Sequence, residues 1–224
     1  MATHVNPGNL AFQFSLNSEI YIDKSMLISY TNKMINTRER FICVSRPRRF
    51  GKSMAAEMLV AYYSVGCSSR DMFAGLKIVG EPDFEKYLNK YNVIHLNVQN
   101  YLSESDNMDE MLELLEDDLI EELEYCYPDI CMPKKRSLQR VLDRVFNDTK
   151  IPFIFIVDEW DCIFRVHREN YDAQKQYLDF LRHLLKDQVY VALAYMTGIL
   201  PIKKYGEHSA LNMFTEISMT DPRE

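Results

Sequence analysis

The alternation of short apolar runs with longer helical segments is the feature that most constrains the fold. Four runs are predicted to be strands, at residues 41–44, 93–98, 154–157 and 189–195. Because strands that alternate with helices usually become parallel neighbours, the chain is predicted to form an α/β fold with a mostly parallel sheet between layers of helices. A length of 224 residues is enough for one such folded unit.

The helices are predicted from apolar residues that recur every three or four positions. The first follows Ile20–Lys24, with Met26, Leu27, Tyr30 and Met34 on one face. The other predicted helices are the segment after Gly51, and residues 107–125, 137–146 and 171–185.

The stretch SRPRRFGKSM, residues 45–54, ends like a phosphate-binding loop. A Gly-Lys-Ser/Thr tripeptide arises by chance in roughly one chain in ten of this length, so the flanks carry the argument. Here an apolar strand precedes the loop and a helix begins at its glycine, which points backbone N–H groups and a helix N-terminus at a phosphate. We therefore expect Lys52 to reach the β- and γ-phosphates, and the Ser53 hydroxyl to bind Mg²⁺.

The loop departs from the usual G-x-x-x-x-G-K-[ST] pattern, because Arg46 stands where the first glycine is expected. Arginine adopts the conformation of that glycine only at a cost, so we expect a different bend, with Pro47 fixing one φ angle. Arg48 and Arg49 face the triphosphate, solvent or an acidic partner; the sequence leaves these alternatives open. The predicted nucleotide-binding residues are Arg46, Pro47, Arg48, Arg49, Phe50, Gly51, Lys52, Ser53 and Met54.

Two carboxylates end the third predicted strand, about a hundred residues after the loop. In a nucleoside triphosphatase the first, Asp158, would hold Mg²⁺, and the second, Glu159, would polarise the attacking water. At the end of the fourth strand, Thr197 is a candidate to sense the γ-phosphate; equally, it is a threonine that begins a glycine turn. Order and spacing favour phosphate binding over a solvated basic turn.

Five ordered segments together resemble the bacterial AAA-ATPase-like family. They are Tyr21–Ser25, Arg46–Ser53, Met72–Leu76, Val157–Asp161 and Thr197–Gly198, which match its Y-[VI]-D-K-[ST], R-P-R-R-F-G-K-S, F-x-G-L, I-D-E-Y-D and T-G-[VI] motifs. The resemblance implies that an arginine in place of the first glycine is a family feature. It also implies a three-layer P-loop NTPase fold of AAA/ASCE type, with an extra strand between the loop strand and the acidic strand. One departure is Trp160, where the family usually has tyrosine.

The resemblance also bears on domain organisation. Residues 1–224 are predicted to be a single AAA-ATPase-like domain on which residues 1–39 pack. Family members commonly continue into a helical lid and a domain similar to PD-(D/E)xK nucleases, whereas this chain stops at Glu224. We therefore expect a fragment or a short form, in which a nucleic-acid or protein partner would be contacted through the missing C-terminal region.

Composition limits the remaining possibilities. A net charge of −7 argues against nucleic-acid binding by the whole domain. Much of this charge lies between residues 106 and 124. These acids form either a solvated helix face or a docking surface for a basic partner. Five cysteines without paired zinc spacing, and the absence of a long apolar stretch or a leader, predict a cytoplasmic protein that does not enter the membrane.

We therefore expect an ATP-binding protein that hydrolyses ATP slowly with Mg²⁺ and acts as a nucleotide switch, with Glu159, Lys52 and Thr197 as catalytic residues. Ser53 and Asp158 would be the metal ligands. The alternatives are a nucleotide-gated interaction module that does not hydrolyse ATP, and a small-molecule kinase. The prediction of ATP rather than GTP rests on the resemblance and on the lack of an N-K-x-D pattern, which would recognise guanine. The oligomeric state is left open.

Overall fold

The computed structural model describes residues 2–202 and 211–218. The strands are β1 (Phe41–Ser45), β2 (Asn92–Asn97), β3 (Phe153–Asp158), β4 (Val191–Gly198) and β5 (Thr215–Ile217). The α-helices are α1 (Leu10–Leu16), α2 (Met26–Met34), α3 (Lys52–Tyr63), α4 (Phe84–Tyr87), α5 (Val98–Glu104), α6 (Met108–Cys126), α7 (Leu138–Thr149), α8 (Cys162–Val166) and α9 (Tyr171–Leu185). Two short 3₁₀ helices, η1 (Arg70–Phe73) and η2 (Lys77–Gly80), precede α4.

The sheet of the described residues has the strand order β2-β3-β4-β1-β5, and each neighbouring pair is parallel. The strand β4 lies between β1, which precedes the phosphate loop, and β3, which ends in the two acids. The extra strand that the resemblance implied is therefore present. All five strands run the same way. The loop, the acids and Thr197 therefore lie together at the carboxyl ends of the strands.

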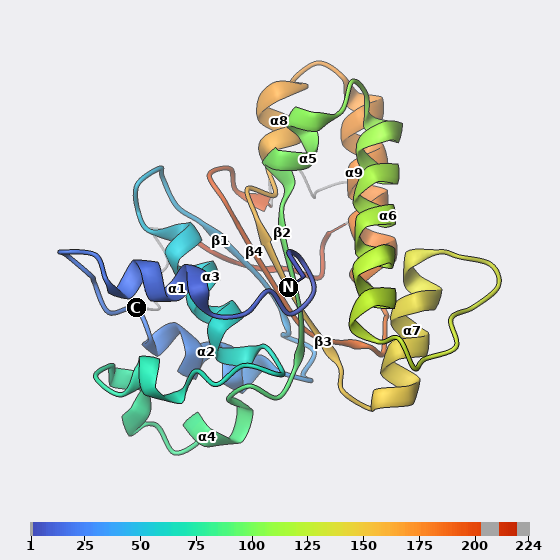
Figure 1. Ribbon diagram of the computed structural model, residues 1–224. Helices are drawn as coiled ribbons and strands as arrows, with labels where there is room; N and C mark the ends of the chain where they lie inside the picture. The colour runs from blue at the N-terminus through green and yellow to red at the C-terminus, as the bar shows by residue number, and fades with distance from the viewer. Residues whose placement is uncertain (1, 203–210, 219–224) are drawn as a thin grey trace.

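Helices cover both faces of this sheet (Figure 1). On one face, α1, α2 and α3 surround an apolar cluster that includes Phe12, Leu59 and Ile156. On the other face, α6, α7 and α9 enclose a second cluster that includes Leu119, Val141 and Phe155. The predicted three-layer α/β fold of P-loop NTPase, AAA/ASCE type, is confirmed.

Most long elements lie where the periodicity placed them. The helix α9 has the predicted bounds, and α6 and α7 begin directly after Asn107 and Ser137, their N-cap residues. The elements that the sequence did not predict are short: α1, α4, α5, α8, β5 and the two 3₁₀ helices. In this part of the chain no helix is long and apolar enough to cross a membrane, and all five cysteines are free thiols.

The predicted apolar face of the first helix is only partly buried: Leu27, Tyr30 and Met34 pack against the first cluster at its margin. The buried residues of α2 are Ile28, Ser29, Thr31 and Asn32, whereas Met26 is 42% exposed. Polar residues are tolerated inside because they bond one another: the Thr31 hydroxyl lies 2.7 Å from the Tyr63 hydroxyl. Met26, Leu27 and Tyr30 also line a cavity, which is described below.

The acidic face of α6 also has a structural role that the sequence did not predict. The carboxylate of Glu122 accepts hydrogen bonds from the backbone N–H groups of Thr3, His4 and Val5, at 2.7–2.8 Å. Val5 then forms an isolated antiparallel bridge with Ile94 of β2. One acid of this helix therefore ties the start of the described chain to the core, rather than serving a solvated face.

Candidate functional site

The loop between β1 and α3 bends in a different place from the usual phosphate loop. Within this loop, positive φ angles occur at Arg49 (φ 68°) and Gly51 (φ 70°), but not at Arg46. The expected change of bend is therefore found, and the strained conformation falls on Arg49. The Arg46 backbone N–H donates to the Gly198 carbonyl, 3.0 Å away, so the loop starts as an extension of the β1–β4 pairing.

Gly51 is the N-cap residue of α3, in the left-handed conformation. A Cβ added there would lie 2.7 Å from Lys24 Nζ. The positive φ therefore favours glycine, and an added methyl group would also displace the Lys24 ammonium. The first turn of α3 then carries Lys52 and Ser53 at the end of the helix where phosphate groups are stabilised.

Lys52 and Ser53 have different partners. The Lys52 ammonium donates to the Pro47 carbonyl of its own loop at 3.1 Å, and no carboxylate pairs with it among the described residues. The Ser53 hydroxyl donates to Asp158 Oδ2 at 2.6 Å. That bond joins two residues 105 positions apart, and it brings together the two predicted metal ligands.

The Ser53–Asp158 pair fits a magnesium site. Asp158 is 3% exposed, and both groups offer oxygen atoms, which Mg²⁺ prefers. Within residues 2–202 and 211–218 no cluster of three or more His, Cys, Asp or Glu residues could hold a metal. Mg²⁺ commonly keeps several waters and takes only one or two carboxylates with the substrate phosphates, so a Ser–Asp pair is sufficient protein ligation.

Glu159 follows Asp158 with a φ of 53°, and its carboxylate forms an ion pair with Arg165 of α8. Both side chains are partly buried, at 25% and 19% exposed. This partner of Glu159 was not predicted from the sequence. The ion pair therefore keeps the Glu159 carboxylate, the predicted water-orienting group, against α8 and partly shielded from solvent.

Asp161 is a third acid at this end of the sheet, and the sequence did not predict it as part of the site. It is fully buried, and Oδ2 accepts hydrogen bonds from the backbone N–H groups of Ile199 (3.1 Å) and Leu200 (2.9 Å). Arg165 Nε lies 3.4 Å from the same oxygen. Asp161 therefore fixes the turn after β4, and Arg165 joins that turn to Glu159. The last acid of the Val157–Asp161 motif was the available signal.

Thr197 pairs with Asp158 in the β3–β4 register. It is fully buried, and its hydroxyl has no hydrogen-bond partner in the described part of the chain. The neighbouring backbone is fixed, because the backbone N–H of Trp160 donates to the Thr197 carbonyl at 3.2 Å. The structure thus places Thr197 beside the acids, and its role as a γ-phosphate sensor stays a prediction.

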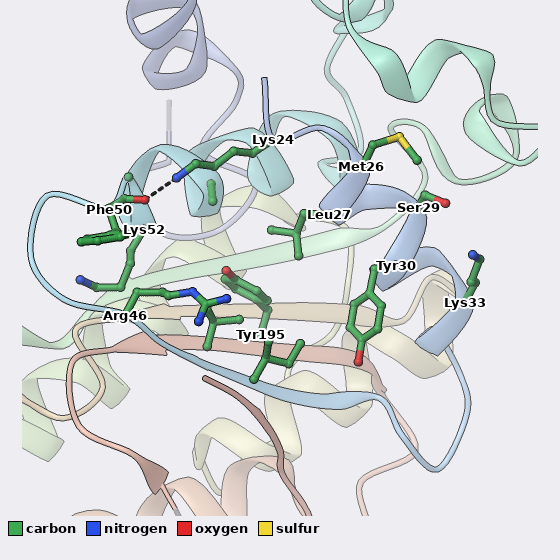
Figure 2. Close-up of a pocket in the computed structure, with 14 residues that line it drawn as sticks. Lys24, Met26, Leu27, Ser29, Tyr30, Lys33, Arg46, Phe50, Lys52 and Tyr195 are labelled. Atoms are coloured by element: carbon green, nitrogen blue, oxygen red, sulfur yellow. Dashed lines mark hydrogen bonds between the residues drawn. The ribbon is translucent and has the colours of Figure 1, made fainter. Parts of the chain in front are cut away.

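Asp23 and Lys24 are neighbours in the chain, but their side chains have different partners. Asp23 accepts backbone N–H groups from Ser25 (2.8 Å) and Lys77 (3.0 Å). Burial alone would raise the pKa of Asp23, but the hydrogen bonds from Ser25 and Lys77 lower it. Lys24 instead points to the loop, where its ammonium donates to the Phe50 carbonyl (Figure 2). Burial, and then the charge of Arg46, lower the pKa of Lys24.

Of the other predicted loop residues, Pro47, Arg48, Arg49 and Phe50 are exposed, whereas Arg46 and Met54 are half-buried. Arg46 Nη1 is buried, and the described residues offer it no hydrogen-bond partner. The loop therefore has an unpaired guanidinium nitrogen within it and two arginines on its outer side.

Comparisons with known proteins identify one family for this chain. A family model described as a predicted AAA-ATPase matches residues 12–206. No curated protein matches the chain. Among solved structures, C. elegans PCH-2 is 14% identical over 93% of this chain and 46% of its own, with a TM-score of 0.40. The Aeropyrum pernix ORC2 protein, in ADPNP–ADP complexes, is 11% identical over 91% and 51%, with a TM-score of 0.43. The chain spans about half the length of these structures.

Proposed function

The chain belongs to the predicted AAA-ATPase family, and we propose that it binds Mg·ATP at the phosphate loop and hydrolyses it slowly as a nucleotide switch. The observation that carries the proposal is the 2.6 Å bond between Ser53 Oγ and Asp158 Oδ2. It joins the loop to the acidic strand end, where a triphosphate and its metal would lie side by side. Membership of the family supports nucleotide binding; Mg²⁺ dependence and hydrolysis are our proposals.

Each residue would have a distinct task in binding. The backbone N–H groups at the start of α3 and the Lys52 ammonium would hold the β- and γ-phosphates, after Lys52 leaves the Pro47 carbonyl. Ser53 and Asp158 would hold Mg²⁺, whose charge offsets the negative charge that develops on the phosphates. Thr197, buried beside Asp158 with an unpaired hydroxyl, would form a hydrogen bond with the γ-phosphate end.

In hydrolysis, Glu159 would orient a water molecule and accept one of its protons. The water oxygen bonds to the γ-phosphorus while the bond from that phosphorus to the β–γ bridging oxygen breaks, and the bond's electron pair leaves with ADP. The products are ADP and inorganic phosphate. Because Glu159 is ion-paired with Arg165, its carboxylate must turn from the guanidinium toward the water, which is consistent with slow turnover.

The same ion pair supports a second candidate function, a nucleotide-gated module that binds ATP without hydrolysing it. If Arg165 kept Glu159 engaged throughout, ATP would fix one conformation of the turn held by Asp161. Tight Mg·ATP binding with phosphate release at the background rate would favour this alternative over the ATPase.

Asp158→Asn tests the metal site. We expect Mg²⁺ to tighten ATP binding to the wild-type protein by at least about tenfold, because the metal bridges the phosphates and the protein. In Asp158→Asn that gain should fall to about twofold or less, since an amide carries no charge. Titrations of ATP with Mg²⁺ and with EDTA measure both gains. Asp143→Asn, on α7 and remote from the loop, is the matched control. An undiminished Mg²⁺ effect in Asp158→Asn would rule out this ligand assignment.

A further inference from the structure

A cavity of about 670 Å³ adjoins the phosphate loop on the side away from the acids. Figure 2 shows its position between α2 and the ends of the central strands. The strand residues that line it are Val44 of β1, Tyr195 of β4 and Ile217 of β5. Asp158 and Glu159, in contrast, lie at the end of β3, beyond β4. The loop therefore separates two regions: acids on the β3 side and a cavity on the β5 side.

The walls of the cavity are mostly apolar or aromatic. Leu27 and Tyr30 of α2 point toward the sheet, where Tyr195 lies (Figure 2). Val44 of β1 also lines the cavity. A volume of several hundred cubic ångströms with apolar walls is typical of a small-molecule site.

The charged residues that line the cavity are all positive. Lys24, Lys33, Arg46 and Lys52 line it, and none of the described residues that line it is Asp or Glu. Lys24 and Lys52 donate to two carbonyls of the same loop, at Phe50 and Pro47. The charge of Arg46 contributes to the lowered pKa of Lys24. Cations held together without a carboxylate indicate a site for an anion at the loop end of the cavity.

From this arrangement we propose that the cavity holds the base and ribose of the bound nucleotide, and that Lys24 contacts its phosphates. The inference rests on the proposed function. It sets the direction of the nucleotide: the γ-phosphate points toward Asp158 and Glu159, and the nucleoside lies between α2 and β5. Lys24 then leaves the Phe50 carbonyl for a phosphate oxygen, and joins the N-terminal segment to the loop. A phosphoryl acceptor does not fit this cavity, because the acceptor must lie at the γ-phosphate end.

A smaller cavity of about 360 Å³ shares Lys24, Phe50 and Gly51 with the larger one. Its other walls include Ile20 and Ile22, which are 77% and 68% exposed. It reaches none of the strand ends and holds neither Arg46 nor Lys52. The larger cavity is therefore the one continuous with the phosphate-binding groups.

The first test uses ATP and inorganic tripolyphosphate as paired probes, both with Mg²⁺. Leu27→Trp fills the larger cavity, so we expect ATP affinity to fall at least about tenfold while tripolyphosphate affinity stays within about twofold. Retained tripolyphosphate binding also reports that the variant is folded. Tyr30→Trp is a second variant with the same expected pattern. Ile22→Trp, in the smaller cavity, is the matched control, and should bind both probes like the wild type.

Lys24→Met tests the phosphate contact. Because Lys24 would touch phosphate rather than base, its loss should weaken ATP and tripolyphosphate alike, by about tenfold. The control is Lys90→Met, which removes an ammonium that donates to a carbonyl far from the loop, that of Glu85 at 3.1 Å. Calorimetric titration measures all four affinities.

Several outcomes would overturn the inference. The first is that Leu27→Trp and Tyr30→Trp bind ATP with the affinity of the wild type. The second is that only Ile22→Trp loses ATP binding. The third is that Lys24→Met binds both probes with the affinities of the wild type. If the wild type binds tripolyphosphate as tightly as ATP, the loop binds phosphate but the larger cavity does not bind the nucleoside. If the wild type binds neither probe, the proposed function fails first.

Discussion

Glu159→Gln should bind Mg·ATP within about twofold of the wild type and release phosphate at least about 100-fold more slowly. Glutamine has the shape of glutamate, but its amide cannot accept a proton from the attacking water. Lys52, Ser53 and Asp158 are unchanged in this variant, so the groups that hold the triphosphate and the metal remain. Titration with Mg·ATP and a steady-state phosphate-release assay separate the two effects.

Glu169→Gln is the matched control for that experiment, because Glu169 is exposed beyond α8 and has no place in the site. It should leave binding and turnover unchanged. Phosphate release by Glu159→Gln at the wild-type rate would remove Glu159 from the mechanism. Equal loss of binding and of turnover would instead mean that the Glu159–Arg165 pair maintains the shape of the site.

Gly198→Ala should lower the free energy of unfolding by about 3 kcal/mol. An added Cβ would lie 2.7 Å from Asp161 Oδ1 and 2.7 Å from Trp160 Nε1. Asp161 and Trp160 are both fully buried, so neither can swing into solvent to make room. The methyl group would push the Asp161 carboxylate away from the backbone N–H groups of Ile199 and Leu200, which donate hydrogen bonds to it. A buried charge would then be poorly paired.

The control for Gly198→Ala is Gly75→Ala, where an added Cβ would meet no atom within 4 Å. Urea unfolding of the two variants measures the difference, and Gly75→Ala should lie within about 0.5 kcal/mol of the wild type. A Gly198→Ala protein as stable as Gly75→Ala would mean that the turn after β4 is not held against Trp160 and Asp161. The prediction concerns the fold, so it stands whatever the nucleotide proves to be.

The parts of this fold that the sequence predicted are those with strong periodicity. The helix α9 has an apolar face long enough to mark both of its ends, and β3 is a continuous buried run. Short elements such as α8 and β5 have only five and three residues. Their conformation depends on contacts with distant parts of the chain, which no local pattern contains.

The helix α2 has the apolar face that its periodicity predicted, but that face is only partly buried. Leu27 and Tyr30 pack against the core cluster and also line a cavity, while Thr31 and Asn32 are buried by bonding to tyrosine hydroxyls of α3. Periodicity identifies an apolar face, and it does not say whether protein or ligand covers that face.

The candidate site divides in the same way. Residues within one motif could be predicted, because strand, loop and helix fix Lys52 and Ser53 locally. Their approach to Asp158 could be expected from parallel strands that end at one edge. The ion pair of Glu159 with Arg165, and the contact of Lys24 with Phe50, depend on how separate segments pack side by side. Nothing in the spacing of those residues specified either contact.

The central claim is that the loop and the acidic strand end form one Mg·nucleotide site. The most direct test is calorimetric titration of Mg·ATP into the wild-type protein and Lys52→Ala. We predict saturable binding by the wild type and a loss of at least about 30-fold in Lys52→Ala, since that side chain supplies the ammonium nearest the triphosphate. Binding by neither protein, or equal binding by both, would contradict the claim.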